Sequence, residues 1–334
     1  MAKYLVSLII LGCIAGVQAG NDLSDFSNNL ATDLGPLLAL FGDSITVQYL
    51  SESTSFLDYF IFAMAPIGII TAIVSTIRVC GSSSLRAFIG RSQEGESSIE
   101  AALCTSTSRD VCEMFNKGGI TRVLGRPTIL ELIQDPRIRN GQGLDLFRNY
   151  LDRSISSETS SEWSRTTPAP KHDSNSQTEM LAPTPNLSLN VGIIQRSRWV
   201  FFAVAATGLL LESFTLAFAG VGVWVFDWTL NEGAGGAARD YAPTMFILGT
   251  ILLSTGMWSC AALIGQTTHE IRYKRQDQPD TWLSQLMWLQ PGPQVIGDQS
   301  FDSFAFFEKE GKRLKIWTSS TKDLSKKYEG FAEW

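Results

Sequence analysis

The sequence has little histidine and lacks the common motifs of nucleotide-binding and metal-dependent enzymes. Among 334 residues, His172 and His269 are the only histidines. There is no Gly-x-x-x-x-Gly-Lys-Ser/Thr loop, no Gly-x-Gly-x-x-Gly turn and no His-Glu-x-x-His pair. The net charge of −6 gives no basic signature of nucleic-acid binding. These absences predict no cofactor, no bound metal, no nucleic-acid partner and no enzymatic activity.

The apolar residues are concentrated in long uncharged runs separated by charged, Ser-rich stretches. A soluble core is built from apolar residues dispersed at helix or strand spacing, so this distribution predicts a membrane protein. The first run follows Lys3 and ends near the small residues Val17 and Ala19. We expect a signal peptide of residues 1–19, with a retained signal anchor as the alternative. Either one carries residue 20 across the membrane.

Three later runs are long enough to cross a bilayer, which takes about 20 helical residues. We predict transmembrane helices at residues 59–78, 199–226 and 243–265. The expected fold class is therefore an α-helical multi-pass membrane protein with three transmembrane helices, a small α+β cytosolic portion and a disordered Ser/Thr/Pro linker.

The charges beside these runs predict the orientation, because Lys and Arg disfavour translocation. Residues 20–58 hold six acidic residues and no Lys or Arg, so this acidic segment is expected to be exterior. The loop of residues 227–242 has three acidic residues and one arginine, and it is also expected to be exterior. The basic residues that flank the runs then all face the cytosol: Arg78, Arg86, Arg91, Arg196, Arg198, Arg272, Lys274 and Arg275.

Residues 79–150 are expected to form the cytosolic α+β portion. Within it "SSIEAALC", "RDVCEMFNKG" and "RPTILELIQD" predict helices, and "GITRVLG" predicts a strand. Its main part, from Leu85 to Tyr150, has about 65 residues and is marginal as an independent core. We therefore expect it to pack on the C-terminal tail or on the bilayer.

Residues 151–198 are rich in Ser, Thr and Pro and poor in aliphatic residues, which predicts a disordered linker. The linker contains the one N-glycosylation sequon of the chain, Asn186-Leu187-Ser188. A cytosolic linker would leave this sequon unused, so a glycan on Asn186 would contradict the predicted orientation.

The cytosolic tail of residues 266–334 contains an amphipathic segment at residues 281–290. Trp282, Leu283, Leu286 and Met287 would share one face of a helix before Pro291 ends it. The two interpretations are a helix on the inner membrane surface and ordinary packing under the cytosolic portion.

Three cysteines are expected in the cytosol, where disulfides are uncommon. Cys80 directly follows the first predicted span and is a candidate for palmitoylation, with a plain interfacial cysteine as the alternative. Cys104 and Cys112 are separated by seven residues, which is not a usual zinc spacing.

The stretch Gly42-Asp43-Ser44-Ile45-Thr46 resembles the first block of the GDSL, or SGNH, hydrolases, in which the serine is the nucleophile. Those enzymes use a histidine from a late Asp-x-x-His block, whereas Ala169 and Gln266 precede the two histidines here. No Gly-x-Asn-Asp block supplies oxyanion donors. Ser44 is therefore not expected to be catalytic, and a GDSL-type hydrolase is only a remote alternative.

Glu212 is the one ionisable residue inside a predicted span, and such residues are functional candidates by default. It could face Ser254 or Thr255 of the third span. The alternative is a protonated structural carboxyl that is hydrogen-bonded between helices.

Several long stretches, among them "YLSESTSFLDYFIFAMAPIGIITAIVSTIRVCG", "CTSTSRDVCEMFNKGGITRVLGRPTILELI" and "WLQPGPQVIGDQSFDSFAF", resemble segments of a group of filamentous-fungal multi-pass membrane proteins without an assigned activity. Some members of that group are labelled as ankyrin-repeat-containing, but no 33-residue ankyrin period is present here. The resemblance implies one membrane-embedded unit and transfers no catalytic residue.

The function expected from these features is that of a sensor, receptor-like or scaffold protein in a membrane of the secretory pathway, which includes the plasma membrane. Its partners would be the lipid bilayer and unidentified proteins on the cytosolic side. A channel or transporter subunit that uses Glu212 is the alternative.

Overall fold

The computed structural model describes most of the chain after residue 41. The described residues are 42–64, 67–136, 143–156, 162–166, 182–192, 197–225, 236–276, 283–309 and 313–322. The predicted signal peptide of residues 1–19 and the first part of the predicted exterior segment lie outside them.

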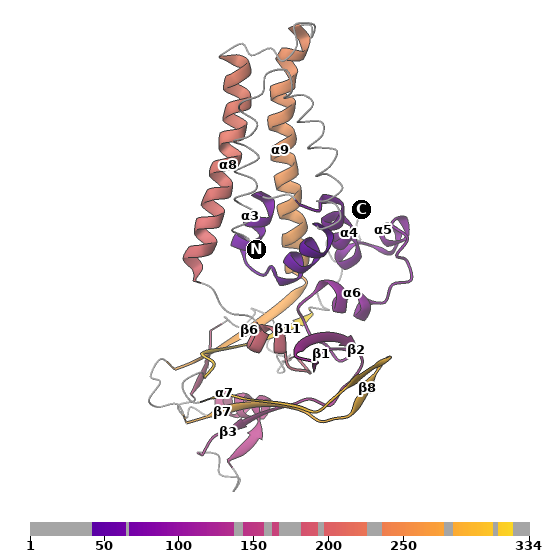
Figure 1. The fold of residues 1–334 in the computed structure, drawn as a ribbon, viewed down its shortest axis with the longest axis vertical. Coiled ribbons are helices and arrows are strands. Elements are labelled where there is room, and N and C mark those ends of the chain that lie inside the picture. Colours follow the sequence, from indigo (N-terminus) through magenta and orange to yellow (C-terminus); the bar gives the residue numbers. More distant parts are fainter. Residues whose placement is uncertain are drawn as a thin grey trace.

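Two long helices stand side by side at one end of the molecule, and the strands gather at the other end (Figure 1). The long helices are α8 (Arg198–Trp224) and α9 (Gly236–Gly265). Shorter helices lie beside the lower part of α9 and below it: residues 42–52, α3 (Phe56–Met64), α4 (Ile69–Cys80), α5 (Ser83–Phe88) and α6 (Glu96–Leu103). Helix α7 (Phe147–Ser156) and the π-helical turn η1 (Ser188–Gly192) belong to the strand-rich end.

The strands of the described residues form four antiparallel sheets. One has the order β10 (Phe304–Phe307), β7 (Gln285–Gln290), β3 (Leu130–Gln134) and β4 (Leu144–Leu146). A second has the order β11 (Ile316–Lys322), β6 (Thr268–Arg275) and β5 (Trp163–Arg165). The other two are hairpins: β1 (Val111–Asn116) with β2 (Gly119–Leu124), and β8 (Gln294–Ile296) with β9 (Gln299–Phe301).

Local sequence explains several of these strands. In β6 the side chains of Ile271, Tyr273 and Arg275 are buried and alternate with outward residues, as a strand with one covered face requires. The β1–β2 hairpin turns at Lys117 and Gly118, both with positive φ, which suits the two-residue turn that follows the right-handed twist of strands.

Two large apolar clusters account for most of the core of the described residues. In the first, Phe147, Trp163, Tyr273, Trp288 and Trp317 pack together and join the two larger sheets with α7. In the second, residues from the 42–52 helix, α3, α4 and α6 surround the last turns of α9, where Met257, Ala261 and Ile264 are buried. We call these four helices the collar.

The prediction of three transmembrane helices is wrong. Of the described residues, two helices are long and apolar enough to cross a membrane, Arg198–Trp224 and Tyr241–Gly265, which match the second and third predicted spans. The first predicted span, residues 59–78, is divided between α3 and α4. Gly68 adopts a left-handed φ of 66° directly before α4, so the apolar run changes direction there. The architecture is a mixed α/β one in which strands from the central and C-terminal parts of the chain are interleaved.

Three predicted helices are also wrong. Residues 111–116 and 130–134 are strands β1 and β3, and the segment of residues 281–290 supplies strand β7. β7 lies between β10 and β3 with Leu286 and Trp288 buried in protein, so it is not a helix on a membrane surface. Short apolar runs fit either structure by periodicity alone, and for β3 and β7 the deciding strand partners are remote in sequence.

Other local predictions are confirmed. "SSIEAALC" supplies α6 and "GITRVLG" supplies β2. The expected packing of the central segment on the C-terminal tail is confirmed by the pairing of β3 with β7.

The prediction of a disordered linker is wrong for the described parts of residues 151–198. Trp163 is buried in the core and its strand pairs with β6. Residues 182–192 are also ordered, with Asn186, Leu187 and Asn190 buried. Other parts of the predicted linker lie outside the described residues.

Candidate functional site

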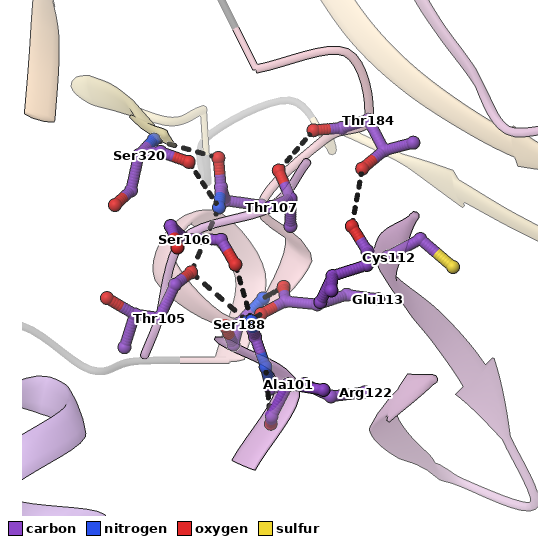
Figure 2. Close-up of polar contacts among 12 residues, drawn as sticks. Ala101, Thr105, Ser106, Thr107, Cys112, Glu113, Arg122, Thr184, Ser188 and Ser320 are labelled. Atoms are coloured by element: carbon purple, nitrogen blue, oxygen red, sulfur yellow. Dashed lines mark hydrogen bonds and ion pairs between the residues drawn. The ribbon is translucent and has the colours of Figure 1, made fainter. Parts of the chain in front are cut away.

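A buried polar cluster lies where the collar meets the sheets, and Arg122 of β2 is its centre (Figure 2). The Arg122 guanidinium donates to the main-chain carbonyls of Ala101 at 3.3 Å and Thr105 at 3.2 Å, and also to the carbonyl of Ser106. These carbonyls lie at or just beyond the C-terminal end of α6, where a cation is favourable. The arginine thus attaches the collar to the β1–β2 hairpin.

Glu113 of β1 is the anionic partner of this arginine. Its side chain is fully buried, and Oε1 accepts a hydrogen bond from Arg122 at 2.8 Å. The hydroxyl of Ser188 donates to the same oxygen at 2.7 Å, and the amide of Ser188 donates to Oε2 at 2.8 Å. Both carboxylate oxygens are therefore occupied, so Glu113 serves as an ion-paired acceptor that fixes η1 rather than as a general base.

Two asparagines extend the cluster to β11. The Asn186 amide nitrogen donates to the carbonyls of Thr105 at 3.1 Å and Ser320 at 3.3 Å, and its oxygen accepts from the Ser320 amide at 2.9 Å. Asn190 makes the matching pair of bonds to the amide and carbonyl of Thr318, at 2.7 and 2.8 Å. These side chains complete the hydrogen bonding of a strand edge, as a neighbouring strand would.

Because Asn186 is buried, the absence of a glycan on its sequon does not indicate the orientation of the chain. Asn186 is 1% exposed and is bonded on three sides, so a glycan cannot be attached without opening the fold. An unmodified Asn186 is therefore compatible with either side of a membrane.

The second polar cluster is centred on Arg275 at the end of β6. This fully buried arginine forms ion pairs with Glu162 at 3.0 Å and Glu308 at 3.1 Å. Its guanidinium carbon lies 4.5 Å from the centre of the Trp163 ring, which adds a cation–π contact. The ion pairs of Arg275 thus connect β6 with Glu162, directly before β5, and with Glu308, directly after β10.

Glu131 of β3 lies between two tryptophan side chains from different sheets. The indole nitrogens of Trp288 and Trp317 both donate to its Oε1, at 2.7 and 2.6 Å. Burial raises the pKa of the carboxyl to about 7, although the two indole hydrogen bonds act in the opposite direction. Glu131 thus links the two larger sheets and titrates near neutral pH.

The junction between α9 and β6 consists of only Gln266 and Thr267. The helix is continued by hydrogen bonds from the Gln266 amide to Ala262 and from the Thr267 amide to Ile264, at 3.0 and 3.1 Å. The Tyr59 ring of α3 packs so closely on Gly265 that a side chain there would overlap it. Helix and sheet are therefore connected without a flexible linker.

The residues singled out in the sequence are distributed as follows. Glu212 of α8 accepts a hydrogen bond from Ser254 of α9 at 2.7 Å, while its other oxygen is buried without a partner among the described residues. The Cys80 thiol points at the carbonyl of Leu263, 3.6 Å away, on the α9 side of α4. Cys104 and Cys112 are buried in different apolar clusters, and the described residues include no group of three or more potential metal ligands.

Ser44 is exposed on the 42–52 helix, whereas His269 lies on β6 opposite Thr321 and His172 lies outside the described residues. The neighbours of Ser44 make the contacts in this stretch. Thr46 donates to the carbonyl of Ile67 at 3.0 Å, and Asp43 accepts from the Thr71 hydroxyl at 2.8 Å. The stretch that resembles a hydrolase block therefore packs on the α3–α4 junction.

Sequence reasoning missed the polar residues that connect the sheets with their neighbouring segments: Glu113, Arg122, Glu131, Asn186 and Arg275. Glu113 and Glu131 carry the usable signal, because a carboxyl between Cys112 and Met114, or between Leu130 and Leu132, is costly in an apolar strand unless it has partners. The other three residues have no such signal in their local sequence.

No protein-family model, curated protein or solved structure matches the chain. The fungal resemblance therefore stays a prediction.

Proposed function

We propose that the chain is a membrane-anchored sensor or scaffold, in which the hairpin of α8 and α9 holds a strand-rich domain at the membrane surface. The observation that carries this proposal is the two-residue connection from α9 to β6. Because β6 is the central strand of its sheet, a displacement of α9 moves β5 and β11 with it. A simple tether would not need this rigid connection.

The surface of the hairpin supports membrane anchoring. α8 carries large apolar side chains outward along its whole length, among them Trp199, Leu210 and Phe214. A soluble helix of 27 residues would bury such a face against protein. Lipid is the solvent that suits an exposed surface of this composition.

The polar clusters support a domain that keeps its shape while it binds a partner. Arg122, Glu113 and the two asparagines connect the collar, the β1–β2 hairpin, η1 and β11. Apart from the Arg122–Glu113 pair within the hairpin, these bonds join segments that are separated in sequence. The domain therefore offers a fixed surface rather than a set of mobile loops.

We further propose that the domain faces the cytosol. Arg198 begins α8, and Arg272 and Lys274 follow α9. At the other end of the hairpin, residues 227–240, which include the start of α9, carry three acidic residues and one arginine. A hairpin returns the chain to the side from which it came. With no further long apolar helix among the described residues, this orientation conflicts with the predicted translocation of residue 20.

Glycosylation mapping distinguishes a cytosolic strand-rich domain from one that a signal peptide has carried across the membrane. A sequon is inserted into the connection between α8 and α9 in one variant and appended after Trp334 in another, and both are translated with microsomes. The proposal expects a glycan on the connection only. A glycan on the appended sequon would contradict the cytosolic domain and support the signal peptide instead.

Affinity capture from native membranes tests the scaffold function. The C-terminally tagged chain is compared with its Arg122→Met variant, which disrupts the polar cluster, and with the exposed control Arg126→Met. We expect a reproducible partner protein that is retained by Arg126→Met and lost with Arg122→Met. An unchanged set of captured proteins in all three samples would contradict the proposal.

The contact between Glu212 and Ser254 favours a second candidate function, a channel or transporter subunit. A carboxyl between two apolar helices with an unpartnered oxygen could bind an ion or a proton. In reconstituted vesicles, Glu212→Gln should then change ion flux. A structural role predicts that Glu212→Gln alters only stability or assembly.

A further inference from the structure

The short helix α5 exposes two large apolar side chains to solvent. Leu85 is 45% exposed and Phe88 is 86% exposed, while no residue of α5 is buried. The helix is nevertheless well defined at its start, where the Ser82 side chain caps it by accepting from the Leu85 amide. A helix that presents Leu and Phe outward needs an apolar neighbour.

The connection of α4 to α9 fixes the depth at which α5 lies. The Cys80 thiol at the end of α4 contacts the Leu263 carbonyl in the last turn of α9, and the Thr76 hydroxyl contacts the Cys260 carbonyl. α5 starts three residues after Cys80. Figure 1 shows α5 at the height of the lower part of α8 and α9, well above β8. The helix therefore lies at the depth of the apolar hairpin and not with the sheets.

The segment that follows α5 is held against α4 by an ion pair. Arg78 of α4 forms an ion pair with Glu94, in which the Arg78 Nε lies 2.9 Å from Glu94 Oε2 and both side chains are largely buried. Gly90 turns the chain with a φ of 73°. α5 is consequently held between α4 and this ion pair.

Helix α4 also exposes apolar side chains. Ile70 is 78% exposed and Ile73 is 46% exposed. Arg86 and Arg91 provide positive charge beside Phe88, and Arg91 is exposed. Apolar side chains with flanking arginines are the composition of an element that lies in a membrane interface.

We propose that α5 and the outward side of α4 bind the lipid bilayer, with Leu85 and Phe88 inserted into the leaflet next to the sheets and Arg91 at the phosphates of anionic phospholipids. This inference rests on the membrane anchoring proposed above. It adds a second membrane contact that does not cross the bilayer and that fixes how the sheets are oriented toward the surface.

Photo-crosslinking to lipid tests the proposal. A photoreactive amino acid replaces Phe88 in the full-length protein in vesicles of phosphatidylcholine and phosphatidylserine, and adducts are identified by mass spectrometry. Two controls carry the same group at Leu210 of α8, which is 70% exposed, and at Val295 of β8, which is 71% exposed. We expect phospholipid adducts at positions 88 and 210 and none at position 295.

The controls separate the two proposals. A lipid adduct at position 210 without one at position 88 would overturn the role of α5 and leave the anchoring hairpin intact. The absence of lipid adducts at both positions would overturn the anchoring itself. A protein adduct at position 88 would show that a protein covers α5 and would also overturn the inference.

The role of Arg91 has its own test. The adduct yield at position 88 should be several-fold higher in vesicles that contain phosphatidylserine than in pure phosphatidylcholine. Arg91→Gln should remove this preference, while Lys117→Gln, an exposed substitution on the β1–β2 turn, should keep it. Equal yields in the two lipids for the unaltered protein would overturn the headgroup contact.

Discussion

The hydroxyl of Thr46 donates a 3.0 Å hydrogen bond to the main-chain carbonyl of Ile67, at the junction of α3 and α4. A carbonyl freed where a helix is interrupted needs a partner, and this bond supplies one. Gly42 lies against Ile67 so closely that a Cβ would be 2.9 Å from the isoleucine Cγ2. The 42–52 helix therefore packs directly against the break between α3 and α4.

Gly68→Ala should destabilise the protein strongly. A Cβ at this position would overlap the Thr46 hydroxyl, and the residue has a φ of 66° that disfavours any side chain. Gly90→Ala is the matched control, because its φ of 73° is equally unfavourable but no atom lies within 4 Å of the added carbon. We expect Gly90→Ala to cost about 1 kcal/mol and Gly68→Ala roughly 3 kcal/mol or more, measured by thermal unfolding in detergent. Equal losses would contradict the close approach of Thr46.

Ser44→Ala should leave the melting temperature unchanged, since Ser44 is exposed. Thr46→Val, two residues away, should lower it, because the Ile67 carbonyl would lose its donor at a cost of about 1–3 kcal/mol. Ester hydrolysis is measured on the same preparations. An esterase activity that disappears in Ser44→Ala would show that the stretch is a catalytic block after all.

Arg122→Met should cost about 3–5 kcal/mol, because it leaves the fully buried Glu113 without its counter-charge. Arg126→Met removes a similar ion pair, with Asp110 at 2.7 Å, but there both side chains are about half exposed. Exposed pairs contribute about 0–1 kcal/mol, so the melting temperature of this control should hardly change. A small effect of Arg122→Met would mean that the buried cluster does not support the fold.

Glu131 should make stability depend on pH. Its pKa is raised to about 7 in the folded protein, so the folded state holds a proton that the unfolded state releases above about pH 4.5. The contribution of Glu131 to the free energy of unfolding is therefore greatest at low pH and declines as the pH rises from about 4.5 to 7. The shift corresponds to a change on the order of 3 kcal/mol.

Glu131→Gln removes the titration while an amide oxygen can still accept from both indoles. As the pH is raised from 5 to 7.5, the melting temperature of the wild type should therefore fall relative to that of Glu131→Gln. A constant difference over this range would show that the carboxyl titrates normally.

Sequence reasoning was most successful where a feature is local and long. Helices α8 and α9 are apolar on average over 27 and 25 residues, and only a helix satisfies the backbone of such a stretch in lipid. It was also correct for α6 and β2, whose boundaries follow from nearby residues. It failed for β1, β3 and β7, because a strand is stable only with partners, and β3 pairs with a segment more than 150 residues later.

By itself, the sequence determined that two long apolar helices exist and that the stretch around Ser44 lacks the companions of a hydrolase. The tertiary structure decided that residues 59–78 do not form a continuous helix, since the left-handed Gly68 and the Thr46 hydrogen bond stabilise an interruption there. It also decided which polar residues matter, because burying Glu113, Glu131 or Arg275 is favourable only beside the particular donors and acceptors that remote segments bring. Such pairings depend on the whole fold and leave little trace in the local sequence.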